Sequence, residues 1–182
     1  MSIKKISKIQ PESFEFSKDN LLEAENEIKK YPKNRKASAI LALLFLVQKQ
    51  NDNWIPLAAI KYVAKFLAVP YIQVYEVSTF YSMFNLSPVG KYFVQVCTTT
   101  PCMMRGSKKI VDICKKNISK NQFELSKNKL CSWTEVECLG ACVNLKDSGC
   151  VSNIFFILID LSHQKLNLMT PEQLEHQLTY VL

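Results

Sequence analysis

The sequence predicts an α+β chain in which a helical bundle precedes a small α/β domain. Between residues 19 and 84 the apolar residues recur at helical spacing. After residue 90, short apolar runs alternate with helix-like segments. The turn-forming residues 87–90, Ser-Pro-Val-Gly, separate the two patterns. We therefore expect two domains, residues 1–88 and residues 89–182.

The first domain should begin with two helices. Asp19 or Asn20 can cap the first helix, which should end near Lys30 because the residue before Pro32 is pushed out of the α region. The second helix is predicted over residues 36–50. Its apolar stripe is wide, so it should be the most buried helix of the bundle.

Pro56 and Pro70 should open the third and fourth helices, because proline is tolerated in the first helical turn. The expected apolar stripes are Ile60, Val63, Ala64 and Leu67 in the third helix, and Val74, Val77, Phe80 and Tyr81 in the fourth. Aromatic residues are frequent over residues 71–84, and their helical spacing favours packing in a core over stacking on nucleic acid.

The second domain should alternate strands and helices. The predicted elements are a strand over residues 91–96, a helix over 101–117, short strands over 123–125 and 133–137, a buried strand over 154–159, and a C-terminal helix that starts with the capping box at residues 170–173. This order predicts a small α/β sandwich.

Composition narrows the class of protein. The chain has 182 residues, 48% of them hydrophobic, and its longest apolar run covers nine residues, 39–47, which is too short to cross a bilayer. The net charge of +7 comes mainly from lysines spread along the chain, a pattern that favours a solvated surface or an acidic partner over nucleic acid. Seven cysteines without a secretory signal indicate a reducing compartment.

Four cysteines form two close pairs, Cys97-x4-Cys102 and Cys138-x3-Cys142. Cys97 should follow directly after the strand over 91–96, and Cys102 should lie in the first turn of a helix whose N-terminus favours negative charge. Gly140 and Ala141 allow a close backbone approach. Four thiolates can hold a [2Fe-2S] cluster or a zinc ion. The wide spacing favours the cluster, while zinc and a redox disulfide stay open as alternatives.

Four segments together resemble the E subunit of bacterial NADH:quinone oxidoreductase, the complex known as complex I. They are Phe80-Tyr81-Ser82-Met83-Phe84-Asn85, Val89-Gly90-Lys91-Tyr92, Val94 to Cys102 with Cys97-Thr98-Thr99-Thr100-Pro101-Cys102, and Glu135 to Asn144 with Cys138-Leu139-Gly140-Ala141-Cys142. The resemblance covers roughly residues 14–144. Residues 145–169 depart from the family pattern, which leaves the packing and docking of that stretch open.

The resemblance implies a thioredoxin-like second domain that carries one [2Fe-2S] cluster. Its ligands would be Cys97, Cys102, Cys138 and Cys142. It also implies a partner subunit that binds FMN and NADH, with the cluster near the flavin. The resemblance further implies a one-electron carrier with no catalytic residue of its own. The chain itself has no G-x-G-x-x-G fingerprint, so we expect the nucleotide site on the partner.

Other functions stay open on the sequence alone. The chain could be the equivalent subunit of an NAD-linked hydrogenase or formate dehydrogenase, or a zinc-stabilised assembly module without redox activity. A thioredoxin-like disulfide oxidoreductase would need a C-x-x-C pair, which the sequence lacks. We expect a cytoplasmic position at the inner face of the cell membrane, with the matrix side of the mitochondrial inner membrane as the alternative.

The remaining candidate residues have less specific roles. Cys114 should be a small buried residue, and no partner is assigned to Cys131 or Cys150. His163 and His176 are isolated and are expected at the surface or at helix ends. Glu135 and Glu137 either lie near the metal centre, where they would lower its reduction potential, or simply face solvent.

Overall fold

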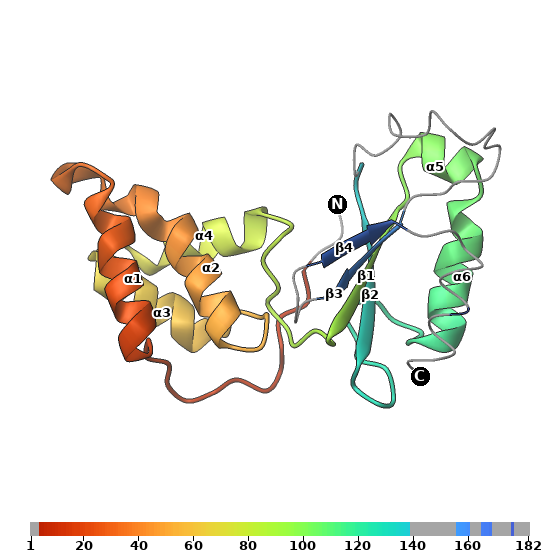
Figure 1. Ribbon diagram of the computed structural model, residues 1–182, viewed down its shortest axis with the longest axis horizontal. Coiled ribbons are helices and arrows are strands. Elements are labelled where there is room, and N and C mark those ends of the chain that lie inside the picture. Colours follow the sequence, from red (N-terminus) through yellow and green to blue (C-terminus); the bar gives the residue numbers. More distant parts are fainter. Residues whose placement is uncertain (1–3, 139–155, 161–164, 169–175, 177–182) are drawn as a thin grey trace. The chain divides into compact units, whose positions relative to one another are not determined.

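The computed structural model describes residues 4–138, 156–160, 165–168 and 176. The chain divides into two compact units, the helical unit, Lys4–Pro88, and the sheet unit, which contains the described residues from Val89 onward. Figure 1 shows the helices of the first unit and the strands and helices of the second. The predicted α+β class is confirmed.

The helical unit contains four α-helices and one 3-10 segment. They are α1 Lys18–Lys29, η1 Lys33–Ala39, α2 Ile40–Gln50, α3 Leu57–Leu67 and α4 Tyr71–Phe80. All four predicted helices are present, and α2 is rich in buried side chains, as expected from its wide apolar stripe.

The starts of the first two helices differ from the prediction. Ser17 caps α1 in place of Asp19 or Asn20, and its hydroxyl accepts a hydrogen bond from Asn20 N at 3.3 Å. Serine is as good a cap as aspartate, so the preference alone could not choose between neighbouring candidates. The second α-helix starts at Ile40, because Arg35 has non-helical dihedrals and the preceding residues form a 3-10 segment.

Pro56 and Pro70 each lie one residue earlier than predicted, at the N-cap position of α3 and α4. Both have extended backbone dihedrals, and the helix begins with the next residue. The predicted stripe of α3 is buried at every position: Ile60, Val63, Ala64 and Leu67. The helix ends at Ala68, which adopts the left-handed conformation with φ 54°.

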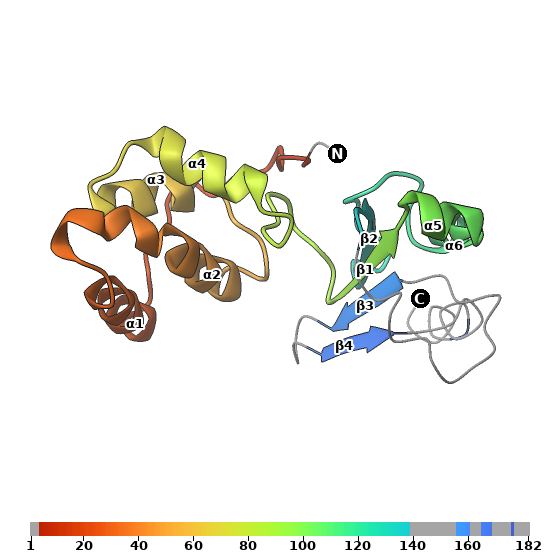
Figure 2. The same ribbon diagram turned by 90° about the horizontal axis from the view of Figure 1, so that it is seen from above.

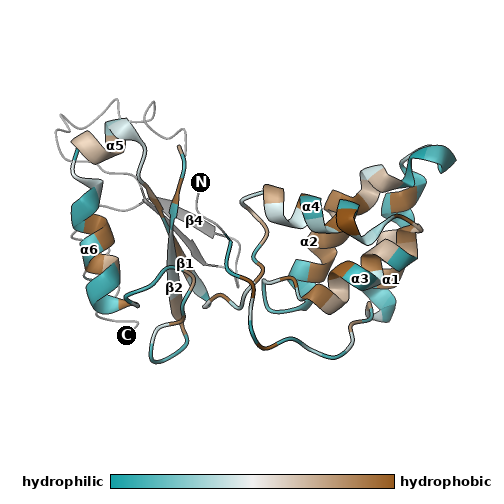
Figure 3. Cartoon of the chain, turned by 180° about the vertical axis from the view of Figure 1, so that it is seen from behind, coloured by the Kyte–Doolittle hydropathy of each residue, from teal (hydrophilic) through white to brown (hydrophobic). Residues whose placement is uncertain are grey.

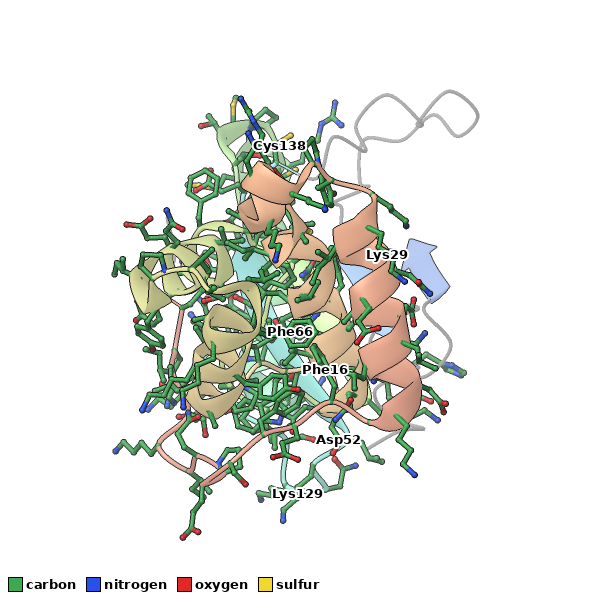
Figure 4. The ribbon with its side chains drawn as sticks, turned by 90° about the vertical axis from the view of Figure 1, so that its left-hand side faces the viewer. Phe16, Lys29, Asp52, Phe66, Lys129 and Cys138 are labelled. Carbon is green, nitrogen blue, oxygen red and sulfur yellow. The ribbon has the colours of Figure 1, made fainter. Side chains whose placement is uncertain are left out.

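Aromatic rings hold one side of the helical core together. Phe16 packs edge-to-face against Tyr62 at 5.4 Å and against Phe66 at 6.2 Å between ring centroids, and Phe14 contacts Phe16 and Tyr62 in the same way. Figure 4 labels Phe16 and Phe66 within this unit. Edge-to-face pairs are favourable beyond the area they bury.

The prediction that the aromatic residues of 71–84 pack in the core is only partly right. Phe84 is buried, but Phe80 is 68% exposed and Tyr81 is 38% exposed. Helix α4 ends at Phe80, so the helical spacing that would turn Tyr81 toward the core no longer applies. The predicted stripe of α4 is therefore buried at Val74 but not at its C-terminal end.

The N-terminal segment is tied to the end of the helical unit. Lys4 Nζ donates hydrogen bonds to the carbonyl oxygens of Ser78 and Tyr81, and Ser7 N donates to Leu86 O at 3.0 Å. Burial lowers the pKa of Lys4 to about 8. These bonds satisfy carbonyl groups at the end of α4 that have no partner within the helix.

The sheet unit contains a four-stranded mixed sheet in the order β2-β1-β3-β4. The strands are β1 Tyr92–Cys97, β2 Cys131–Val136, β3 Phe156–Asp160 and β4 Lys165–Leu168, and the helices are α5 Thr100–Met104 and α6 Ser107–Asn117. Strand β1 is parallel to β2 and antiparallel to β3, which pairs antiparallel with β4. Figure 2, seen from above, shows α5 and α6 on one side of β1 and β2.

The core of the sheet unit lies between α6 and these two strands. Val94 and Val96 of β1 and Trp133 of β2 are buried together with Ile110 and Val111 of α6. Val94 pairs with Trp133 in the parallel register. Figure 3 shows both hydrophobic and hydrophilic residues along α6, as expected of a helix that covers a sheet with one face.

The predicted helix over 101–117 is two helices. Gly106 has φ 96°, a conformation that ends α5 and starts α6 in a new direction. The predicted strand over 123–125 is also wrong. Phe123 has φ 58°. Its segment is joined to β2 by isolated backbone hydrogen bonds and not by a strand ladder; one of them runs from Phe123 N to Trp133 O at 2.9 Å.

The structure tests the predictions for the later strands and the C-terminal helix only in part. Strand β3 overlaps the strand predicted over 154–159 but starts two residues later and ends one residue later, and β4 was not predicted. The predicted C-terminal helix lies almost wholly outside the described residues, as do residues 145–155. Among the described residues, no helix is both long and apolar enough to cross a membrane.

Candidate iron-sulfur site

The parallel pairing of β1 and β2 brings two predicted ligand positions to one edge of the sheet. Cys97 is the last residue of β1 and pairs with Val136, the last residue of β2. Thr98 N donates a hydrogen bond to Val136 O at 3.2 Å, so the two chains are still joined just after β1 ends. Cys138 lies two residues after Val136. It therefore follows β2 at the same end of the sheet where Cys97 completes β1.

The described thiols differ in their exposure. Cys97 is 1% exposed and Cys102, in α5, is 2% exposed, whereas Cys138 is exposed. Figure 4 labels Cys138, which lies beyond the end of β2. Cys142 lies outside the described residues. The structure therefore places three of the four predicted ligands, two of them shielded from water.

The loop between Cys97 and Cys102 supplies a polar partner for the first sulfur. Thr99 Oγ1 lies 3.2 Å from Cys97 Sγ, a hydrogen-bonding distance. Thr99 is also the N-cap residue of α5, and its carbonyl oxygen accepts a hydrogen bond from Met103 N at 2.9 Å. The loop therefore places a hydroxyl beside the sulfur of the first proposed ligand.

The described residues fit a [2Fe-2S] cluster in their donor chemistry. Sulfur donors are the ligands that iron-sulfur clusters and zinc prefer. Within the described part of the chain, no three His, Cys, Asp or Glu side chains are grouped closely enough to hold one metal ion. A [2Fe-2S] cluster does not require such a group, because its four ligands are shared between two irons.

Gln122 is hydrogen-bonded to Thr134 and Glu135 of β2, a contact that the sequence patterns did not indicate. Its side-chain oxygen accepts hydrogen bonds from Glu135 N at 3.3 Å and Thr134 Oγ1 at 3.2 Å, while its Nε2 donates to Glu135 Oε1 at 2.9 Å. The Glu135 carboxylate is thus held by Gln122, and Glu137 is exposed. No spacing rule could have indicated Gln122, because it lies in an irregular segment.

Two further cysteines lie in the core and away from the loops. Cys114 of α6 and Cys131 of β2 are fully buried in the cluster of apolar residues around Val94 and Trp133. Burial raises the pKa of the Cys114 thiol to about 12, with a smaller contribution from Cys131, and raises that of Cys131 to about 11. The expectation that Cys114 is a small buried residue is confirmed.

The other isolated candidates are described only in part. His176 is exposed, whereas His163 and Cys150 lie outside the described residues. Residues 145–169, which depart from the family pattern, are described only at 156–160 and 165–168. These two segments form β3 and β4.

The sequence is similar to proteins of one kind, the E subunits of NADH-quinone oxidoreductase. It is 58% identical over 132 residues to the E subunit of Rickettsia typhi, an alignment that covers 72% of this chain and 78% of that protein. It is 47% identical over 163 residues to the E subunit of Rickettsia bellii, with 90% and 91% covered. It is 50% identical over 147 residues to an E subunit of Rhizobium meliloti, with 79% and 53% covered.

A family model agrees with these relatives. The model for the thioredoxin-like [2Fe-2S] ferredoxin matches residues 24–145, a range that includes all four predicted ligands. The mixed sheet and the helix that covers it agree with a thioredoxin-like domain. With more than half of its length matched, this chain belongs to the thioredoxin-like [2Fe-2S] ferredoxin family.

Proposed function

We propose that the chain is the [2Fe-2S] electron-transfer subunit of NADH-quinone oxidoreductase. The observation that carries the proposal is the β1–β2 register, which brings Cys97 and Cys138, one from each cysteine pair, to the same edge of the sheet. The relatives, which are named as E subunits of this oxidoreductase, support the assignment to the complex. We assign an electron carrier, with no residue of this chain in bond-making chemistry.

The proposed ligands are Cys97, Cys102, Cys138 and Cys142. When bound, the cluster supplies one-electron transfer. The chain fixes the first pair through β1 and α5 and keeps both sulfurs out of water. A buried thiolate pair favours tight retention of the metal, since water and competing ligands cannot reach the bonds.

The proposed partner is the flavin- and NADH-binding subunit of the complex. The chain has four glycines, all far apart, so a glycine-rich nucleotide loop has no place on it. Met103 and Met104, next to Cys102, are 64% and 85% exposed, and exposed methionines suit an adaptable protein contact. We place the chain on the cytoplasmic side of the membrane through this complex, or on the matrix side in a mitochondrion.

The two-unit organisation supports a division of roles. We propose residues 1–88 as a helical domain that contributes to assembly and residues 89–182 as the domain that carries the cluster. Each has a hydrophobic core of its own, formed in the helical unit around α2 and α3 and in the sheet unit around Val94 and Trp133.

Anaerobic purification followed by visible absorption and low-temperature EPR tests the function. We expect a brown protein that gives the signal of a single two-iron centre after dithionite reduction. Replacing any one of the four proposed ligands by Ser should weaken or abolish the signal. A colourless sample that contains zinc in stoichiometric amount would contradict the electron-transfer assignment and would favour the zinc-stabilised module.

Cys114→Ser is the matched control. The same atom is replaced, but the residue lies in the core and not in the loops that bear the proposed ligands. The cluster signal should therefore persist in this variant. Loss of the signal in Cys114→Ser with retention in Cys97→Ser would contradict the ligand assignment.

A further inference from the structure

We propose that Thr99 is a positioning residue whose hydroxyl donates a hydrogen bond to the Cys97 sulfur and raises the reduction potential of the cluster. This inference rests on the proposed function, because it assumes that Cys97 is a ligand. It goes further by assigning a role to a side chain that is not itself a ligand. The supporting observation is the distance of 3.2 Å between Thr99 Oγ1 and Cys97 Sγ.

The place of Thr99 in the fold explains why its hydroxyl is available. Thr99 is the N-cap residue of α5, a position where a threonine side chain usually accepts a hydrogen bond from the second or third helical N–H. The second helical residue is Pro101, which has no N–H to donate. Within the described helix α5, the Thr99 side chain makes no capping hydrogen bond, and its hydroxyl lies beside the sulfur instead.

The backbone holds this arrangement at both ends. On one side of Thr99, Thr98 N donates to Val136 O at 3.2 Å, which ties the loop to β2. On the other side, Met103 N donates to Thr99 O at 2.9 Å, which ties the residue to α5. The hydroxyl is therefore held near Cys97 by the strand pairing and by the helix.

The direction of the hydrogen bond follows from the chemistry of the ligand. A cysteine that ligates iron is a thiolate and has no proton to give, so the Thr99 hydroxyl must donate. A hydrogen bond to a charged acceptor strengthens as negative charge on the acceptor increases. Reduction adds one electron to the cluster, so the bond stabilises the reduced form more than the oxidised form, and the reduction potential rises.

The test compares three substitutions at residue 99 with one at residue 100. Thr99→Val replaces the hydroxyl by a methyl group of similar size, and Thr99→Ser keeps the hydroxyl. Thr99→Ala removes both the hydroxyl and the methyl group of threonine. Thr100→Val makes the same change at the neighbouring exposed residue and is the matched control. The full chain is purified anaerobically, and its midpoint potential is measured by EPR during titration with dithionite.

We expect the midpoint potential of Thr99→Val to shift to a more negative value. At the wild-type midpoint, the ratio of reduced to oxidised cluster should fall about fivefold, the effect of losing one ordinary hydrogen bond. Thr99→Ser and Thr100→Val should stay within about twofold of the wild-type ratio. Iron and sulfide content, measured in each sample, shows that the same cluster is being compared.

The remaining outcomes also decide the question. A wild-type potential in a fully loaded Thr99→Val protein, or an equal shift in Thr100→Val, would overturn the role of Thr99 and leave the proposed function intact. A wild-type protein without a cluster would overturn both. If Thr99→Val and Thr99→Ala fail to load but Thr99→Ser loads, the hydroxyl is needed to hold Cys97, which supports the proposal; failure of all three overturns it.

Discussion

The cysteine sulfurs of this chain have two kinds of surroundings. Cys97 has the Thr99 hydroxyl beside it and is the last residue of β1, whereas Cys114 and Cys131 are enclosed by apolar side chains. The high pKa values of the enclosed pair keep both thiols protonated at neutral pH. Because iron binds the thiolate, the core cysteines do not compete with the loop cysteines for metal.

The raised pKa of Cys131 predicts a loss of stability at high pH. The pKa rises from 9.0 in the unfolded chain to about 11 in the folded protein, so the folded state holds the proton more tightly. The resulting stabilisation is complete below pH 9 and is lost as the pH rises toward 11. The stability advantage of wild type over Cys131→Ala should therefore shrink by up to about 1.4 kcal/mol per pH unit in this range.

Urea unfolding of both proteins without the cluster, at pH 8, 9, 10 and 11, measures this difference. Lysines and tyrosines titrate in the same range, but their contributions cancel when the two proteins are compared at each pH. A difference in unfolding free energy that stays constant from pH 8 to pH 11 would contradict burial as the cause of the raised pKa.

The candidate site was predictable at some residues and not at others. Four cysteines in two pairs can be found from spacing. Cys102 lies in the first turn of a helix, as predicted, and Cys97, predicted directly after a strand, is the last residue of that strand. The contact of Thr99 with Cys97 depends on how the chain turns from β1 into α5, and the position of Gln122 depends on a loop. Such contacts arise from tertiary geometry, which hydrophobic periodicity does not describe.

At the scale of elements, the predicted type was more reliable than the predicted bounds. Apolar spacing identified α3 and its buried face, because every turn of that helix contributes a side chain to the core. The same spacing continued through Gly106 and could not show that the backbone changes direction there. Single-residue backbone conformations, such as those of Gly106 and Phe123, decide where an element ends.

A close backbone approach makes Gly90 sensitive to substitution. A Cβ atom at this position would lie 2.7 Å from Cys131 N and even closer to the Leu130 carbonyl group, where only backbone could move aside. Gly90→Ala should therefore separate the chain from the start of β2 and destabilise the sheet unit by about 1–3 kcal/mol. Urea unfolding monitored by Trp133 fluorescence, in chains that also carry Trp54→Phe, measures this change.

Ala68→Gly is the opposite substitution and serves as the control. Ala68 has φ 54°, which is unfavourable for alanine and easy for glycine at the end of a helix. This variant should keep or slightly increase the stability of the helical unit, by about 0.5–1 kcal/mol. An equal loss of stability in both variants would show that the two local conformations do not explain the effects.

At the scale of the whole molecule, two cores lie within one chain. The helical unit buries residues of α1 to α4, and the sheet unit buries residues of α6, β1 and β2. The family match begins within α1 and continues to residue 145, so it spans most of the helical unit and the first part of the sheet unit. That the units are separate folding domains stays a prediction.

Expression of residues 4–88 and residues 89–182 as separate fragments tests that prediction. We expect the first fragment to be helical by circular dichroism and to unfold cooperatively, because its core is formed within residues 16–86. The second should bind the cluster on its own, since all four proposed ligands lie in it. A second fragment that is unfolded alone and recovers only when mixed with the first would contradict independent domains.

The pairing of β1 with β2 sets an order of events during biosynthesis. Cys97 and Cys102 leave the ribosome first, and Cys138 follows Cys102 by 36 residues. Cys138 reaches the end of the sheet where Cys97 lies only after the intervening chain has formed α6 and has returned as β2 beside β1. Cells would therefore deliver iron and sulfide to a nearly finished polypeptide, after translation of this region, and not to the growing chain.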